Sequence, residues 1–293
     1  MEKVYCSILN DVIGPVMMGP SSSHTAGPCR IANMARALLG EEIVEAEIVF
    51  DKQSSYAATY RGQGSDYGFL GGLLGMMPED TQLADARRLA TERGLRFTFT
   101  IDELADKHPN AALLRLRGAR NILTVLSHSL GGSMYEIVAL NGFPLRITGE
   151  CDICVVIYRG SSLPARHLPH FEQVGVKEFH TSAGGVLLLE AIYPLDEARV
   201  SAMEADPDCI TLRYVRTDVA VKKFEKQTLP FTNAAAAQAY ADEHGLALWQ
   251  LAVAYECAVG VTDERAMLNN FLHKLDVMAA AAAAGLAGHG VAD

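Results

Sequence analysis

The feature that most constrains this chain is a polar stretch at residues 18–32, which two Gly-Pro pairs enclose. Three serines, a histidine and a threonine follow one another there: Ser21, Ser22, Ser23, His24 and Thr25. Apolar residues then recur at helical spacing up to a stop at Gly40: Ile31, Met34, Ala35 and Leu38. The hydroxyls therefore lie at or just before a predicted helix start, where free N–H groups and the helix dipole favour an anion.

Two interpretations of this stretch are open from its residues alone. A serine or threonine commonly caps a helix, and one hydroxyl is enough for that. Four hydroxyls beside an imidazole exceed what a cap needs, and together they suit a carboxylate or a phosphate.

Composition restricts the partners of the protein. The net charge is −10, with 49% hydrophobic and 20% charged residues, so we expect neither a broad nucleic-acid surface nor binding to an anionic membrane. The longest apolar run, 277–287, is too short to span a bilayer. Six scattered cysteines are typical of reduced thiols in a cytoplasmic protein.

Periodicity predicts a mixed α/β protein, or α+β, that ends in helices. After a short helix over 7–13, the first half carries five strand patterns, at 43–50, 95–101, 111–116, 122–128 and 134–140. Helices are predicted from residue 31 to Gly40, along the glycine-spaced segment 68–75, and from Asp80 or Thr81 to Gly94. We expect the glycines of 68–75 to allow close helix packing.

The second half carries strands at 151–159, 184–192 and 210–216, with helices at 164–174 and 196–204. If residues 177–182 supply one more strand, the order is ferredoxin-like. Three helices follow: 234–243, 246–259 and one from 262 to 284 that Gly285 ends. Cys151 and Cys154 are expected to be buried structural thiols, because positions i and i+3 of a strand face opposite sides.

Residues 19–27 resemble the signature of the β domain of iron–sulfur-dependent L-serine dehydratases. Three further landmarks of that family follow in order. Residues 57–66 match a family segment in which Gln63 stands in place of a histidine and Ser65 in place of a threonine. The turn His108-Pro109-Asn110 matches as well, and a Gly-Gly run at 129–133 precedes Asn141-Gly142-Phe143, with Ser133 at a position where the family has glycine.

The resemblance implies three domains: a serine dehydratase β domain over 1–143, a ferredoxin-like ACT-like domain over 144–222, and a helical segment over 233–293 that is similar to the start of the α domain. The residues it implies for the carboxylate of L-serine or a related small acid, at an active or an allosteric site, are Ser21, Ser22, Ser23, His24, Thr25, Gly64, Asp66, His108 and Asn110. It assigns no catalytic residue and no metal ligand to this chain.

The resemblance also implies the reaction, L-serine to pyruvate and ammonia in serine catabolism and gluconeogenesis, with a [4Fe–4S] cluster as cofactor. The cluster cysteines of the family lie in the α domain, beyond residue 293, so we expect this chain to be inactive alone. The expected partners are an α chain or domain and further copies in a homo- or hetero-oligomer. The alternative is a stand-alone amino-acid-sensing protein without catalysis.

Overall fold

The computed structural model describes residues 5–171, 174–181, 184–217, 219–223, 228–260 and 262–289. The chain forms two compact units, Met17–Asp218 and a second unit that joins Met1–Val16 to Val219–Asp293. The N-terminal segment, expected with the β domain, thus packs with the C-terminal helices. The borders at 143, 222 and 233 stay predictions.

The first unit begins with a six-stranded sheet of order β2-β1-β3-β4-β5-β6. Its strands are β1 (Glu45–Asp51), β2 (Arg96–Asp102), β3 (Ala111–Arg117), β4 (Ile122–Gly131), β5 (Met134–Leu140) and β6 (Phe143–Ile147). β1 and β2 are parallel, and the other neighbours are antiparallel. Five of these strands were predicted. β6 was missed because its five residues include Pro144, which weakens a strand pattern.

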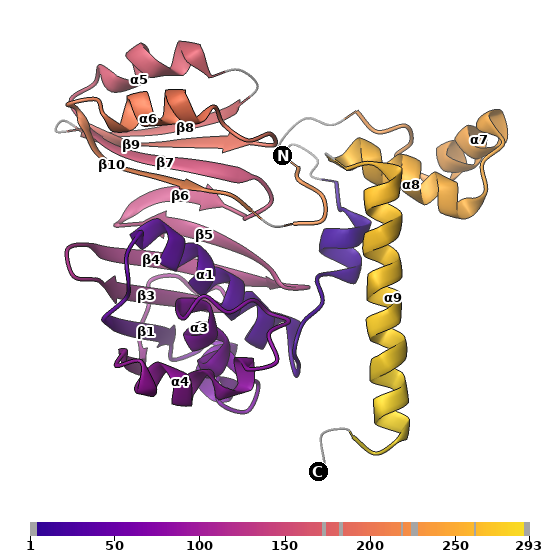
Figure 1. Cartoon of the computed structure of the whole chain (residues 1–293), viewed down its shortest axis with the longest axis horizontal. Coiled ribbons are helices and arrows are strands. Elements are labelled where there is room, and N and C mark those ends of the chain that lie inside the picture. Colours follow the sequence, from indigo (N-terminus) through magenta and orange to yellow (C-terminus); the bar gives the residue numbers. More distant parts are fainter. Residues whose placement is uncertain are drawn as a thin grey trace. The chain divides into compact units, whose positions relative to one another are not determined.

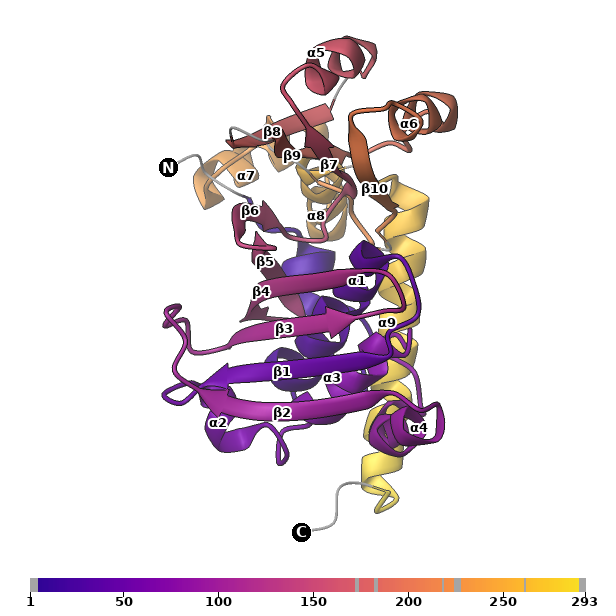
Figure 2. The same cartoon turned by 90° about the vertical axis from the view of Figure 1, so that its left-hand side faces the viewer.

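Helices α1 (Gly27–Leu39), α2 (Ser55–Thr59), α3 (Ser65–Leu73) and α4 (Ala86–Glu92) follow the order in which the sequence predicts helical segments, with α2 in addition. Figure 2 shows the sheet face-on, with α1, α2 and α3 behind it. The predicted apolar positions of α1 are all buried, and Gly40 ends the helix in the left-handed conformation. The helix predicted from Asp80 or Thr81 begins later, as a 3-10 turn over Leu83–Asp85.

Glycines of α3 allow it to pack closely on α1. A Cβ added at Gly68 would fall well inside contact distance of the Thr25 carbonyl oxygen, and one at Gly72 would do the same to the Cys29 carbonyl oxygen. Both obstacles are backbone atoms, which cannot rotate away. The prediction that this glycine-spaced segment serves close helix packing is therefore confirmed.

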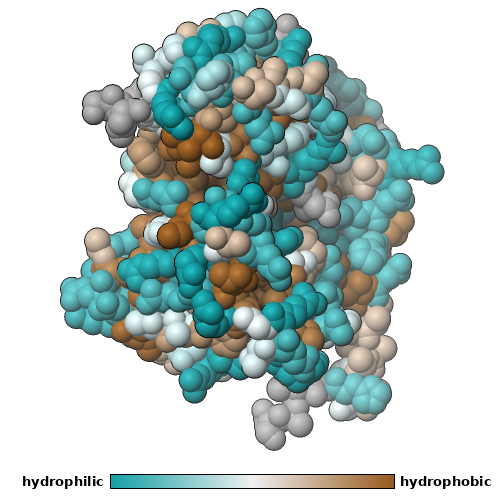
Figure 3. Space-filling model, turned by 60° about the vertical axis from the view of Figure 1, so that its left-hand side comes forward, coloured by the Kyte–Doolittle hydropathy of each residue, from teal (hydrophilic) through white to brown (hydrophobic). Residues whose placement is uncertain are grey.

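The sheet face opposite these helices carries charge. Glu45 and Glu47 on β1 lie directly opposite Arg117 and Arg115 on β3, and each pair forms an ion pair. Hydrophilic side chains are interspersed with smaller hydrophobic areas on the side of the molecule drawn in Figure 3. Such cross-strand pairs of opposite charge stabilise a sheet face that is exposed to water.

The second sheet of this unit has the ferredoxin-like order. Its strands β7 (Asp152–Arg159), β8 (Val174–Thr181), β9 (Gly184–Ala191) and β10 (Cys209–Val215) are arranged β10-β7-β9-β8, all antiparallel. Helices α5 (Leu163–His167) and α6 (Glu197–Glu204) lie on one face (Figure 1). β8 supplies the strand expected near 177–182, whose last residue lies outside the described range.

One helix of this part is shorter than predicted. The expected helix over 164–174 ends as α5 at His167, and a 3-10 turn follows over Leu168–His170. Pro169 has no N–H to donate to the carbonyl four residues earlier, so the α-helical hydrogen bonds stop there, although Leu168 itself keeps α-helical dihedral angles. Val174 already begins β8. Cys151 and Cys154 are buried and free, as expected of structural thiols.

The second unit consists of η1 (Ile8–Ile13), a π-helical segment, and helices α7 (Ala234–His244), α8 (Leu248–Val259) and α9 (Glu264–Leu286). The sequence predicted all four. α9 continues past Gly285, where we expected it to end, because one glycine costs a helix only about 1 kcal/mol in an alanine-rich run. No helix in the described residues is long and apolar enough to cross a membrane.

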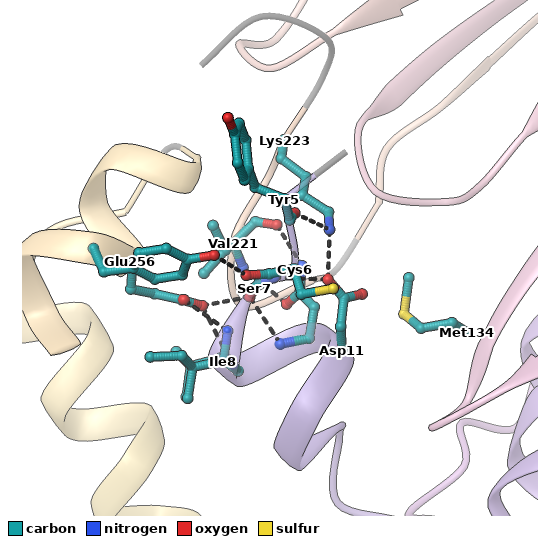
Figure 4. A network of polar contacts seen from close by, with 12 residues as sticks. Tyr5, Cys6, Ser7, Ile8, Asp11, Met134, Val221, Lys223 and Glu256 are labelled. Carbon is teal, nitrogen blue, oxygen red and sulfur yellow. Dashed lines mark hydrogen bonds and ion pairs between the residues drawn. The ribbon is translucent and has the colours of Figure 1, made fainter. Parts of the chain in front are cut away.

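A buried carboxylate holds the N-terminal segment to α8 (Figure 4). Glu256 is fully buried and accepts hydrogen bonds from the Ser7 hydroxyl, the Ile8 N–H at 2.7 Å and the Leu9 N–H at 3.0 Å. Lys223 forms an ion pair with Asp11 at 2.6 Å. The first N–H groups of a helical segment have no acceptor within that segment. The Glu256 carboxylate is the acceptor for the N–H groups of Ile8 and Leu9.

Candidate active or effector site

The hydroxyl cluster lies where the sequence placed it, at a helix start. Residues Ser22–Ala26 form a short π-helical segment, η2, that runs directly into α1. The Ser21 hydroxyl accepts the His24 backbone N–H at 3.1 Å, so Ser21 is the N-cap. The capping interpretation is thus correct for Ser21 and accounts for one of the four hydroxyls. In the described part of the chain the half-buried Ser22 hydroxyl has no hydrogen-bond partner.

His24 joins two hydroxyls. Its Nδ1 lies 2.9 Å from the Ser23 hydroxyl, and its Nε2 lies 2.9 Å from the hydroxyl of Ser55 at the start of α2. Ser21 Oγ is 3.4 Å from Ser23 Oγ and extends the chain of polar groups. Both ring nitrogens are occupied, so His24 orients hydroxyls and does not itself point a free nitrogen at a ligand.

The buried side chain of Tyr56 contacts both Ser23 and His24 and fixes their positions. The Tyr56 hydroxyl donates to the Ser23 carbonyl at 3.1 Å, and its ring meets the His24 ring edge-on at 5.0 Å. Burial lowers the pKa of His24 and raises the pKa of Tyr56. Both groups are therefore neutral near pH 7, and the site relies on hydrogen bonds rather than on an imidazolium charge.

The His108-Pro109-Asn110 turn lies beside the same cluster. The Pro109 carbonyl accepts the Ser55 N–H at 2.8 Å, which links the turn to the partner of His24. Asn110 is held to β4, because its side-chain amide donates to the Ser129 carbonyl at 3.2 Å and its own carbonyl accepts the Ser129 N–H at 3.2 Å. Segments 31 and more residues apart in the sequence thus meet around His24.

Three further predicted site residues, Thr25, Gly64 and Asp66, contact or belong to the start of α3. The Thr25 hydroxyl donates to the Gln63 carbonyl at 2.8 Å, and Gly64 takes the left-handed conformation that starts α3. One Asp66 oxygen pairs with Arg87 at 3.0 Å. Within the described residues, the other Asp66 oxygen and the Ser65 hydroxyl are buried without a partner, which leaves hydrogen-bonding capacity for a ligand or water.

Sequence reasoning missed several side chains of this region. Ser55 and Tyr56 lie immediately before the matched family segment 57–66 and were not named as site residues. Asp106 accepts the His108 backbone N–H, His128 stacks on the His108 ring, and Glu136 lies beside His128. These three residues were missed because strand register and loop geometry bring them together. The one feature of the sequence that could have identified Ser55 as a site residue is that its hydroxyl lies next to the family segment.

The described residues do not fit a metal cluster. No group of three or more His, Cys, Asp or Glu side chains among them is arranged to hold a metal ion. Burial raises the pKa of the Cys29, Cys151 and Cys154 thiols to about 12, which opposes the thiolate form that a metal requires.

Fold and site together define a mixed α/β protein in which several hydroxyls and the imidazole of His24 gather at one helix start. A family model described as serine dehydratase beta chain matches residues 12–102. A probable L-serine dehydratase β chain of Bacillus subtilis (strain 168) is 38% identical over 148 residues, which are 50% of this chain and 66% of that protein.

Two further relatives extend the comparison. The L-serine dehydratase β chain of Peptoniphilus asaccharolyticus is 33% identical over 217 residues, 70% of this chain and 96% of that protein. The L-serine dehydratase of Streptomyces coelicolor (strain ATCC BAA-471 / A3(2) / M145) is 43% identical over 75 residues, 24% of this chain and 16% of that protein. The chain belongs to the serine dehydratase β-chain family.

Proposed function

We propose that this chain supplies the carboxylate-binding part of an iron–sulfur L-serine dehydratase, which converts L-serine to pyruvate and ammonia. The observation that carries the proposal is the gathering of Ser21, Ser23, His24 and Ser55 beside the His108–Asn110 turn. A carboxylate takes several hydrogen bonds from hydroxyl and N–H donors, and such charge-assisted bonds are the stronger ones. Relatives named L-serine dehydratase β chains support the choice of serine.

The residues of this chain would bind and orient the amino acid. Ser22 and Ser23 lie at the helix start, where their hydroxyls and the first backbone N–H groups favour a carboxylate. Neutral His24 holds Ser23 and Ser55 in place. The Asp66 oxygen without a partner would accept a hydrogen bond from an ammonium or hydroxyl group.

The [4Fe–4S] cluster would come from a partner, since the described residues do not fit it. We therefore propose that the chain is inactive alone and assembles with an α chain or domain. Helices α7 to α9 would be the beginning of such a domain, and the ferredoxin-like sheet would be an ACT-like domain. The cytoplasmic location and the oligomer are part of the same proposal.

Pyruvate formation tests this function. The purified chain should contain no stoichiometric iron and form no pyruvate from L-serine, and an added α chain should restore activity. Substituting Ser22→Ala with His24→Ala should then abolish activity in the complete complex. The matched control, Ser201→Ala with His273→Ala, changes two exposed residues of α6 and α9 and should keep activity. Full activity of the Ser22/His24 double variant would refute the proposed site.

A stand-alone amino-acid sensor is the alternative. It would bind L-serine through the same residues and never form pyruvate with any α chain. Capture of an α chain by the full-length protein, followed by the activity measurement above, separates the two functions.

A further inference from the structure

A second imidazole lies under His108. His128 on β4 stacks on His108 with ring centroids 4.2 Å apart and planes 13° from parallel. The two residues are 20 positions apart, and the stack arises because the turn folds back over the strand. No family landmark of the sequence includes His128.

Carboxylates hold His128 at both ring nitrogens. Nε2 lies 2.8 Å from Asp106 Oδ2, and Nδ1 lies 3.5 Å from an oxygen of Glu136, the residue directly opposite on β5. Arg146 on β6 binds the other oxygen of Glu136 at 2.9 Å. An ionised carboxylate only accepts hydrogen bonds, so this setting offers an acceptor to each N–H of an imidazolium.

The hydrogen bonds of His108 specify its tautomer. Nδ1 accepts the Asn110 backbone N–H at 3.2 Å, so the hydrogen of the neutral ring is on Nε2. The His108 N–H is itself held by Asp106 at 2.9 Å. Residues of the turn thereby fix the orientation of the His108 ring, and its Nε2–H remains as a hydrogen-bond donor.

The charged groups around His108 have opposing effects on its pKa. Burial and the charge of His128 lower its pKa, whereas Asp106 and Glu136 raise it, and the net direction is down. The neighbouring Lys107 is held away by its ion pair with Asp51 at 2.9 Å. A positive charge on the stacked His128 ring disfavours a positive charge on His108.

We propose that His128 is a positioning residue: clamped between Asp106 and Glu136 and stacked on His108, it keeps His108 a neutral Nε2–H donor. That donor would serve the carboxylate or hydroxyl of the small acid bound at the helix start, and this ligand role rests on the proposed function. The positioning of His108 by His128 is independent of any ligand.

The test is a histidine titration of the full-length chain by NMR, with isotope-labelled imidazoles. His128→Phe keeps a ring for stacking and removes the two ring nitrogens that Asp106 and Glu136 hold. The His108 midpoint should rise by roughly half to one pH unit in this variant, and the neutral ring should keep its Nε2–H signature. His273→Phe, on the exposed face of α9, is the control and should leave His108 unchanged.

An unchanged His108 midpoint in His128→Phe, or an Nδ1–H signature in the wild type, would overturn the proposal. If the phenylalanine variant does not fold, His128→Gln makes the same comparison without the ring. L-Serine binding measured from pH 5.5 to 8 by the complete complex separates the two ideas. Absence of binding by the wild type refutes the proposed function, whereas normal binding with an unmoved midpoint refutes the role of His128.

Discussion

Replacing Gly68 by alanine tests how the hydroxyl cluster is held. Gly68 is in α3, and its Cα faces the Thr25 carbonyl of the loop. The added Cβ would lie 3.2 Å from both the Thr25 carbonyl carbon and the Pro28 Cβ, and closer still to the carbonyl oxygen. Carbon atoms prefer about 3.5–4.0 Å, so α3 would have to withdraw from the loop by about half an ångström or more.

The expected cost is the difference of two opposing effects. Overpacking against rigid backbone costs about 2–3 kcal/mol, toward the upper part of the usual range. Alanine in place of glycine stabilises a helix interior by about 1 kcal/mol. The net loss should therefore be about 1–2 kcal/mol, which is a 5- to 30-fold change in the local folding equilibrium.

Native-state amide hydrogen exchange measures this loss in peptides from α1 and α3. Gly62→Ala is the matched control, six residues away, because its Cβ would approach nothing closer than the Thr59 carbonyl oxygen at 3.9 Å. That variant should be neutral or more stable by about 0.4–1 kcal/mol, since alanine restricts the unfolded chain. If Gly68→Ala changed the amide exchange of α1 and α3 no more than Gly62→Ala does, the inference that α3 packs closely against the loop would be refuted.

Two further predictions concern carboxylates that fix segments of the fold. Glu256→Gln puts an NH₂ group where the backbone N–H groups of Ile8 and Leu9 need an acceptor, so the N-terminal segment should be less stable by about 1–3 kcal/mol. Its amide hydrogens should exchange faster and its backbone should be cleaved faster by a protease; unchanged protection of residues 5–13 would contradict this. Hydrogen bonds from Lys107 and two backbone N–H groups lower the pKa of Asp51 from 3.8 to about 2, so its contribution to stability is complete above about pH 4 and is lost as the pH falls toward 2. Acid unfolding of Asp51→Asn should lack that part of the pH dependence, and identical acid titrations of both proteins would refute the assignment.

Local chemistry made much of the fold predictable. The helix after the hydroxyls, its glycine stop at Gly40 and the glycine-spaced face of α3 all depend on near neighbours in the sequence. Three of the four strands and both helices of the ferredoxin-like part followed from local patterns in the same way, whereas the fourth strand, β8, was expected only on condition that residues 177–182 supplied it. Those features need only spacing and residue type.

The parts that were missed depend on distant residues. The ring nitrogens of His24 contact Ser23 and Ser55, and the second partner is 31 positions away. That His24 belongs to an anion site stays a prediction. His128 reaches His108 only through the fold of the turn over β4. Glu256 is an ordinary helix position until the N-terminal segment packs on it. No local pattern encodes such contacts.

Calorimetric titration of L-serine into the full chain, with its α partner where that is required, tests the central claim most directly. We expect saturable binding by the wild type and by the control with Ser201→Ala and His273→Ala. Ser22→Ala with His24→Ala should weaken binding at least about tenfold, because the hydrogen bond that Ser22 gives to a charged group is worth about 1.5–3 kcal/mol. Loss of the His24 ring, which orients Ser23 and Ser55, should weaken binding further. Equal affinity of the Ser22/His24 variant and the wild type would contradict the account.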